Sequence, residues 1–78
     1  MNKIVFVIDP SYYELIDSIG LEYHQYKSCE YAVHVDLNYE EEQYGIDINK
    51  ISKLSDDDLS NELLGPELSD GVLYIERY

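Results

Sequence analysis

The sequence predicts one small α+β domain in which strands and helices follow the order β-α-β-β-α-β. Two observations support this order. Apolar side chains run without interruption through most of residues 3–8 and alternate with polar ones through residues 29–37, and both patterns are typical of strands. Capping signals at Ser11 and Ser55 each precede apolar residues at helical spacing. Strand and helix signals therefore alternate along the chain.

The first strand and the first helix have the clearest local signals. Residues 3–8 (KIVFVI) are largely β-branched or aromatic, which predicts a buried strand. Ser11 and Glu14 have the spacing of a capping box, with Ser at the N-cap and Glu at N3. Gly20 is expected to end this helix. The predicted inner stripe of the helix consists of Tyr12, Leu15, Ile16 and Ile19.

Two further strands are expected between residues 21 and 37. Residues 21–26 alternate imperfectly, and residues 27–28 would form a tight connection to the next strand. Alternation is strict in residues 29–37, so we expect one face of the sheet to meet the helices and the other to be open. The inward set is Cys29, Tyr31, Val33, Val35 and Leu37, and the outward set is Glu30, Ala32, His34 and Asp36.

The segment after this strand is predicted to be irregular until the second helix begins. Residues 38–50 are interpreted as a loop with a short extended piece at residues 46–48. Ser55, with Asp58 at N3, is a variant of the capping box and predicts the start of a helix. The Gly-Pro pair at residues 65–66 is expected to end it.

The last elements complete a known arrangement. Asp70 and Gly71 predict a turn, and residues 72–77 predict a final strand. The resulting order is that of the split β-α-β, or ferredoxin-like, sandwich, in which a four-stranded antiparallel sheet carries two helices on one face. Residues 1–78 are expected to form one domain, because the sequence contains no internal repeat, no low-complexity tract and no sign of a second domain.

The charge balance is the most unusual property of the chain. It has 17 acidic and 5 basic residues and a formal net charge of −12, whereas solubility of a small domain needs a magnitude of only about 2–8. A domain of this size is about 30 Å across. Duplex DNA carries the same amount of charge as this net charge of −12 over roughly 20 Å of its axis. The charge density approaches that of nucleic acid, so direct binding to nucleic acid or anionic lipid is not expected.

The single cysteine and the short apolar runs bear on where in the cell the protein is expected. Cys29 is the single cysteine, which excludes an internal disulfide and fits a reducing environment. The longest apolar run near the start has five residues, fewer than the about 7–15 of a secretory signal. We therefore expect no signal peptide, no membrane span and a cytoplasmic location, in the host cytoplasm if the protein is viral.

Acidic side chains concentrate in two parts of the chain that contain no Lys or Arg, residues 28–49 and 54–76. A surface that only resists aggregation normally mixes both signs. The alternatives are a solvated loop for the glutamates and stabilisation of a helix start for the aspartates. We predict instead a surface for a basic partner. Its residues would be Glu30, Asp36, Tyr39, Glu40, Glu41, Glu42, Tyr44, Asp47, Asp56, Asp57 and Asp58.

Geometry and the aromatic residues favour the same interpretation. Residues two apart on a strand are about 6.6–6.8 Å apart, which is on the scale of the phosphate spacing in one nucleic-acid strand. Glu30 and Asp36 would lie on the open face, and Glu40 to Glu42 would continue this path into the loop. The chain also has nine tyrosines and one phenylalanine, and tyrosine is favoured at interfaces and can hold an arginine beside a carboxylate.

Metal binding and catalysis are not expected. Asp36, Asn38, Glu40 and Glu42 have the alternating spacing of a calcium loop, but Glu41 occupies the position where an EF-hand requires glycine. Asp9, at the end of the first predicted strand, resembles the metal-binding aspartate of Cas2-like nucleases, although turn chemistry before Pro10 explains it more simply. The chain contains no nucleophile motif and no phosphate-binding loop, and we predict no cofactor.

Three functions fit these observations. The leading hypothesis is a small inhibitor that blocks the basic nucleic-acid-binding cleft of a partner protein. In composition the chain resembles the DNA-mimic proteins with which phages oppose restriction or CRISPR complexes. The first alternative is an immunity protein or antitoxin that neutralises a basic nuclease toxin. The second is a non-catalytic adaptor or self-associating structural protein, and the chain could act as a monomer or a dimer.

Overall fold

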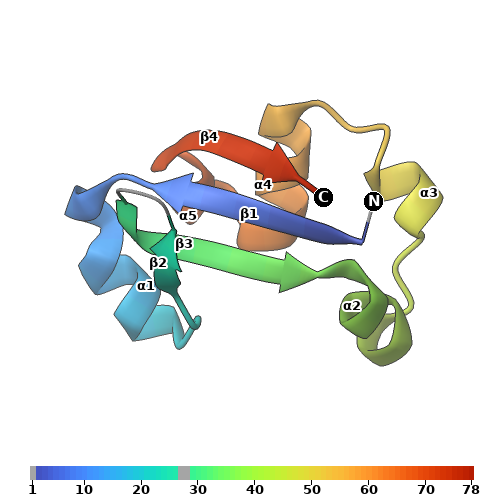
Figure 1. Ribbon diagram of the computed structural model, residues 1–78, viewed down its shortest axis with the longest axis horizontal. Coiled ribbons are helices and arrows are strands. Elements are labelled where there is room, and N and C mark those ends of the chain that lie inside the picture. Colours follow the sequence, from blue (N-terminus) through green and yellow to red (C-terminus); the bar gives the residue numbers. More distant parts are fainter. Residues whose placement is uncertain (1, 27–28) are drawn as a thin grey trace.

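The computed structural model describes residues 2–26 and 29–78, and for residues 26 and 29–31 it describes the backbone alone. Four strands form one antiparallel sheet, so the α+β class is confirmed (Figure 1). The strands are β1 (Lys3–Ile8), β2 (His24–Tyr26), β3 (Cys29–Asp36) and β4 (Val72–Arg77). Across the sheet their order is β2-β3-β1-β4. The two ends of the described chain therefore lie in adjacent strands.

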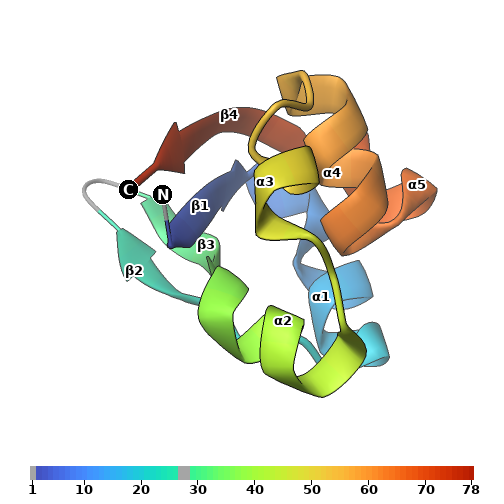
Figure 2. The ribbon, with the colours of Figure 1, turned by 90° about the vertical axis from the view of Figure 1, so that its right-hand side faces the viewer.

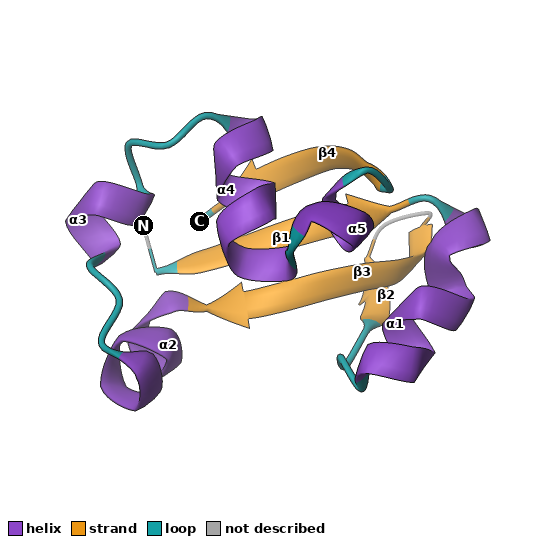
Figure 3. Ribbon diagram, turned by 180° about the vertical axis from the view of Figure 1, so that it is seen from behind, coloured by secondary structure: helices purple, strands orange, loops and turns teal. Residues whose placement is uncertain are grey.

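The helices occupy one face and one end of the sheet. After a 3₁₀ turn, η1 (Pro10–Tyr12), they are α1 (Tyr13–Ile19), α2 (Leu37–Tyr44), α3 (Ile48–Ile51), α4 (Asp56–Leu64) and α5 (Pro66–Ser69). Helices α1, α4 and α5 cover one face of the sheet (Figure 3). Helices α2 and α3 lie at the end where β1 begins and β3 ends (Figure 2). The connection between β3 and β4 thus contains most of the helical residues.

The main core lies between the sheet and the helices. On β1, Ile4, Phe6 and Ile8 share one face and are completely buried, because alternate residues of a strand point the same way. Ile16 of α1 and Leu59 of α4 pack into the same cluster. Its other buried members are Val33, Val35, Leu37, Ile51 and Leu68. The apolar run of residues 3–8 and the inward set of residues 33–37 were therefore correctly predicted.

The opposite face of the sheet is less open than predicted. Ala32, assigned to the exposed side of its strand, is completely buried and forms a second cluster with Val5 and Val7. It lies in register between His24 and Val7. A methyl group between larger side chains on both neighbouring strands is covered by them, which strict alternation alone does not reveal.

The prediction of a loop over residues 38–50 was wrong. Two helices fill this segment, α2 and α3, each beginning after an aspartate that caps it. Asp36 Oδ1 accepts hydrogen bonds from the backbone N–H of Asn38 and Tyr39 at 3.0 and 3.3 Å, and Asp47 caps α3 in the same way. Gly45, at φ 70°, ends α2. The predicted extended piece at residues 46–48 is absent, since Ile48 is already helical.

The first helix begins differently from its predicted capping box. Tyr12 is the N-cap of α1 and makes no side-chain capping bond, whereas Asp9 caps η1: its Oδ1 accepts hydrogen bonds at 2.9 Å from both the backbone N–H and the hydroxyl of Ser11. These bonds stabilise the carboxylate and lower the pKa of Asp9 below its ordinary value, the backbone bond contributing most. The chain then forms the 3₁₀ turn before α1 begins at Tyr13. Gly20, at φ 76°, ends the helix as expected.

The second predicted helix and the last strand are confirmed. Ser55 is the N-cap of α4, with its hydroxyl accepting a bond from the Asp58 N–H at 3.2 Å. Gly65 ends this helix, and Pro66 begins the short α5 in place of a simple stop. Strand β2 is shorter than predicted, since only residues 24–26 pair with β3.

Candidate interaction surface

The described basic residues gather at one end of the molecule. Lys3 begins β1, Lys50 lies in α3 and Lys53 follows it. Arg77, at the end of β4, donates hydrogen bonds to the carbonyl oxygens of Ser52 and Leu54. Figure 1 shows the start of β1, the end of β4 and α3 at the same end. Helix α2, with Glu40 to Glu42, lies at this same end (Figure 2), and the rest of the described surface carries acidic side chains but no Lys or Arg.

Many of the acidic side chains have no partner to neutralise them. Within residues 2–26 and 29–78, one group of carboxylates makes no hydrogen bond or ion pair with another described residue. This group comprises Glu14, Asp17, Glu40, Glu41, Glu42, Asp57, Asp58, Glu62, Glu67 and Asp70. Most belong to α1, α4 and α5, the helical face, or to α2. Unpaired like charges repel one another and raise the potential of the surface.

Helix α2 holds the central part of the predicted surface. Glu40, Glu41 and Glu42 lie in this helix, with Tyr39 and Tyr44 exposed to 53% and 71%. Successive residues of a helix are about 100° apart around its axis, so the three carboxylates fan outwards. The predicted extended path with phosphate-like spacing through this segment is therefore corrected by the structure.

Three predicted contact residues have structural roles within the chain. Asp36 and Asp47 cap α2 and α3, and each cap contributes about 1 kcal/mol to helix stability. Asp56 Oδ1 accepts a hydrogen bond from Arg77 Nη2 at 2.7 Å. A sequence pattern does not separate a capping aspartate from a contact aspartate, because both are exposed acids beside a helix start.

The other predicted residues lie on different elements of the fold. Asp57 and Asp58 are exposed in the first turn of α4. Helix α4 packs on α5 and β4, whereas α2 contacts α3, β1 and β3. The two acidic clusters are thus carried by separate elements. The predicted contact at Glu30 lies outside the described side chains, although its backbone belongs to β3.

Metal-binding geometry is not formed by the described side chains. Within residues 2–26 and 29–78, no group of three or more His, Cys, Asp and Glu side chains is placed to hold an ion. Of the alternating residues considered as a calcium loop, Asp36 caps α2 and Asn38 and Glu40 are helical. Alternation along an extended loop therefore does not apply to them.

A histidine pair lies on the sheet face opposite the helices. The ring centroids of His24 and His34 are 5.6 Å apart, with the rings at 85° to each other. Burial lowers the pKa of His34, and the positive charges of Lys3 and protonated His24 lower it further. Protonation of His34 on this face is therefore less favourable than in a free histidine.

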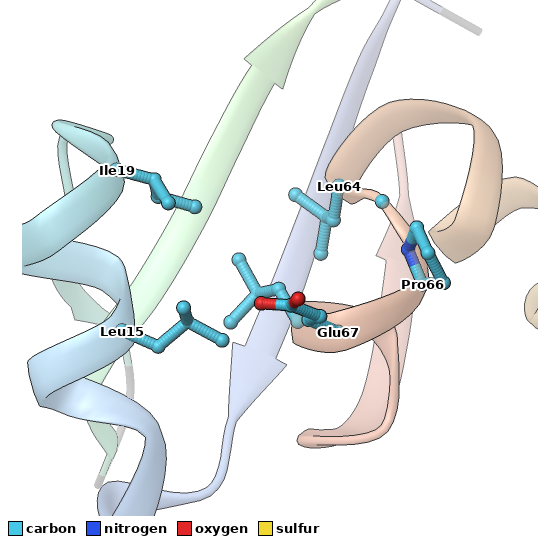
Figure 4. A pocket seen from close by; sticks show the side chains of 7 residues that line it. Leu15, Ile19, Leu64, Pro66 and Glu67 are labelled. Carbon is cyan, nitrogen blue, oxygen red and sulfur yellow. The ribbon is translucent and has the colours of Figure 1, made fainter.

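An apolar groove that sequence reasoning missed lies between α1 and the corner joining α4 to α5. It has a volume of about 200 Å³ and is lined by Leu15, Ile19, Leu64, Gly65, Pro66, Glu67 and Leu68. Figure 4 shows Leu15 and Ile19 on one side and Leu64 and Pro66 on the other. Ile19, predicted to lie on the inner stripe of α1, is instead 50% exposed and lines this groove.

Comparison with protein-family models, with curated proteins and with solved structures finds no match for this chain. Among the described residues, none of the helices has both the length and the apolar character needed to cross a membrane.

Proposed function

We propose that this protein is a small acidic inhibitor that occupies the basic nucleic-acid-binding surface of a partner protein. The observation that carries the proposal is the excess of acidic side chains without a partner. Lys3, Lys50, Lys53 and Arg77 lie at one end. Apart from Asp56, which pairs with Arg77, the carboxylates of α1, α2, α4 and α5 make no hydrogen bond or ion pair with described residues. A basic cleft would gain by pairing with them.

The mechanism is competition for the cleft. The net charge of −12 attracts a basic surface over distances of about 10 Å at 0.1 M salt, which raises the association rate. Exposed tyrosines such as Tyr39 and Tyr44 supply contact area with little loss of side-chain entropy. Nucleic acid and inhibitor would then exclude each other from the same site. A cytoplasmic location is part of this proposal.

The fold proposed for this role is the ferredoxin-like sandwich. The strand order β2-β3-β1-β4 with antiparallel neighbours supports it, as do α1 and α4 on one face (Figure 3). The additional helices α2, α3 and α5 are insertions in that scheme. Such a scaffold leaves the outer faces of its helices available for contact.

A second candidate is an immunity protein or antitoxin that binds a nuclease beside its active site. The arrangement of Glu40 to Glu42 favours it, because carboxylates that fan around α2 do not follow the linear spacing of a phosphate chain. Both candidates share the same attraction to a basic protein. They differ in whether nucleic acid competes for the bound surface.

The test is capture of partners from host lysate with the tagged protein at low and moderate salt, followed by competition with added DNA or RNA. Recovery of a basic nucleic-acid-binding protein that nucleic acid displaces is expected. A captured nuclease that nucleic acid does not displace would favour the immunity protein. A salt-insensitive dimer with no captured partner would overturn both and support the self-associating adaptor.

A further inference from the structure

The apolar groove between α1 and the α4–α5 corner continues into two neighbouring hollows. The first, of about 440 Å³, is lined by Asp57, Asn61, Pro66, Ser69 and Asp70 and shares Pro66 with the groove. The second, of about 200 Å³, lies against β4 and shares Asp57 and Ser69 with the first. Because they share these lining residues, the groove and the two hollows are together called the trough, whose lining extends from α1 across α5 to β4.

Internal hydrogen bonds hold the middle of the trough in place. Ser69 Oγ donates to Asn61 Oδ1 at 2.9 Å, and Asn61 Nδ2 donates to the carbonyl oxygen of Asp57 at 3.0 Å. These bonds tie α5 to α4. The trough is therefore formed before any partner binds, which lowers the entropy cost of binding.

The charges along the trough are all negative. Glu67 lines the apolar groove, and Asp57 and Asp70 line the adjoining hollow. The carboxylates of these three residues have no hydrogen-bond or ion-pair partner among the described residues. None of the described lysines or arginines lines any part of the trough. Apolar walls beside unpaired carboxylates are complementary to a segment that is both apolar and basic.

We propose that this trough docks a segment of a basic partner protein, with one apolar side chain in the groove and an adjacent lysine or arginine between Asp57 and Asp70. The identity of the partner as a basic protein rests on the proposed function. A second copy of this chain is a poor occupant, because it carries the same net charge of −12. The trough would fix the register of the partner, while the remaining carboxylates attract it from a distance.

The test uses nuclear magnetic resonance titration of the ¹⁵N-labelled protein with designed peptides. The probe is an acetylated, amidated amphipathic peptide of leucine, alanine and arginine. One control peptide has glutamate in place of arginine, and another keeps arginine but has alanine in place of leucine. The first peptide is expected to shift the amide signals of Ile19, Leu64, Asp57 and Asp70 and to bind about tenfold more tightly than the leucine-free peptide.

Two exposed residues allow matched variants that keep the fold. Ile19→Ser and Asp70→Asn should each weaken binding of the first peptide by about three- to tenfold. Glu62→Gln removes the same charge from a part of α4 that does not line the trough and should change affinity less than about twofold. Unchanged far-ultraviolet circular dichroism and amide spectra would confirm that each variant folds. Equal effects of Asp70→Asn and Glu62→Gln would overturn the trough, as would peptide-induced shifts centred on α2.

The result separates the trough from the proposed function. If the peptide binds the trough but a captured partner is not displaced by nucleic acid, the docking site stands and competition with nucleic acid fails. Nucleic acid could instead displace the partner while Ile19→Ser and Asp70→Asn bind both peptide and partner like the unmodified protein. That result would support competition with nucleic acid and reject the trough as the docking site.

Discussion

The guanidinium of Arg77 joins the carboxylate of Asp56 at 2.7 Å, linking the end of β4 to the first turn of α4. The same guanidinium donates to the carbonyl oxygens of Ser52 and Leu54 at 3.2 and 3.0 Å. One side chain therefore fastens the segment between α3 and α4 to the edge of the sheet. One of the five basic residues of the chain thus makes its contacts within the molecule.

Replacing Arg77 should cost more stability than replacing its acidic partner. Arg77→Ala removes three hydrogen bonds made by a charged group and is expected to lower the free energy of unfolding by about 1–3 kcal/mol. Asp56→Asn weakens only an exposed ion pair, worth about 0–1 kcal/mol. Urea unfolding of both variants gives the comparison. Equal losses would show that the two backbone contacts contribute nothing measurable.

Protonation of His34 should destabilise the fold as the pH falls. Its pKa in the folded protein lies below the ordinary value of 6.5, because of burial and then of Lys3 and His24. The unfolded chain therefore binds this proton more readily, and stability falls as the pH drops from above 6.5 through the folded pKa. His34→Gln should reduce the pH dependence of the free energy of unfolding between neutral pH and the onset of carboxylate titration.

The control for this experiment is Lys3→Met, which removes one of the two charges that act on His34. The pKa of His34 should rise in that variant, and its imidazole resonances in a pH titration report the change directly. A His34 pKa that stays the same in Lys3→Met would contradict the electrostatic contribution of Lys3. An unchanged pH dependence in His34→Gln would contradict the role of His34 itself.

Gly71 should not tolerate a side chain, for a reason specific to its neighbour. An ideal Cβ on Gly71 would lie 2.5 Å from Cγ of Tyr12, which is closer than packed atoms approach. Gly71→Ala should therefore lower the free energy of unfolding by about 1–3 kcal/mol. In a Tyr12→Ala background the same change should cost less, since Cγ and the ring atoms of Tyr12 that meet the new Cβ are gone. Additive effects in this double-mutant cycle would rule out the clash as the cause.

Local signals predicted elements well where the sequence showed a clear buried pattern. Residues 3–8 have the continuous apolar run of a buried strand, and the helix begun by Ser55 combines apolar spacing with a cap; the structure places both as expected. Helix α2 has the cap but almost no stripe, because Leu37 is its single buried residue. An acidic segment without apolar periodicity reads as a loop in sequence. Tertiary support and the capping Asp36 fix its helical conformation.

The candidate surface was predictable in composition but not in arrangement. The excess of acids is visible in the sequence, and it remains unpaired over α1, α2, α4 and α5 among the described residues. The apolar groove has no local pattern, since Ile19 and Leu64 are far apart in the chain and meet only through packing of α1 near the α4–α5 corner. Conversely, two aspartates of the predicted contact surface, Asp36 and Asp47, stabilise helix starts.

Neutralising the α2 glutamates should weaken partner binding without weakening the fold. The triple variant Glu40→Gln, Glu41→Gln, Glu42→Gln has a net charge three units less negative than the −12 of the unmodified chain. The carboxylates that it removes make no stabilising contact with described residues. The free energy of unfolding should stay the same or rise, because repulsion is relieved. Association with the basic partner should slow, with a smaller dependence on salt.

The matched control is Glu14→Gln, Asp17→Asn, Glu62→Gln, which removes three exposed charges from α1 and α4. Surface plasmon resonance against the captured partner at two salt concentrations would give both rate constants. A larger loss for the α2 variant than for the control would place α2 in the contact surface, since long-range attraction alone affects both variants alike. Unchanged affinity in the α2 variant would exclude α2 from that surface and leave the trough over α5 as the contact region to test.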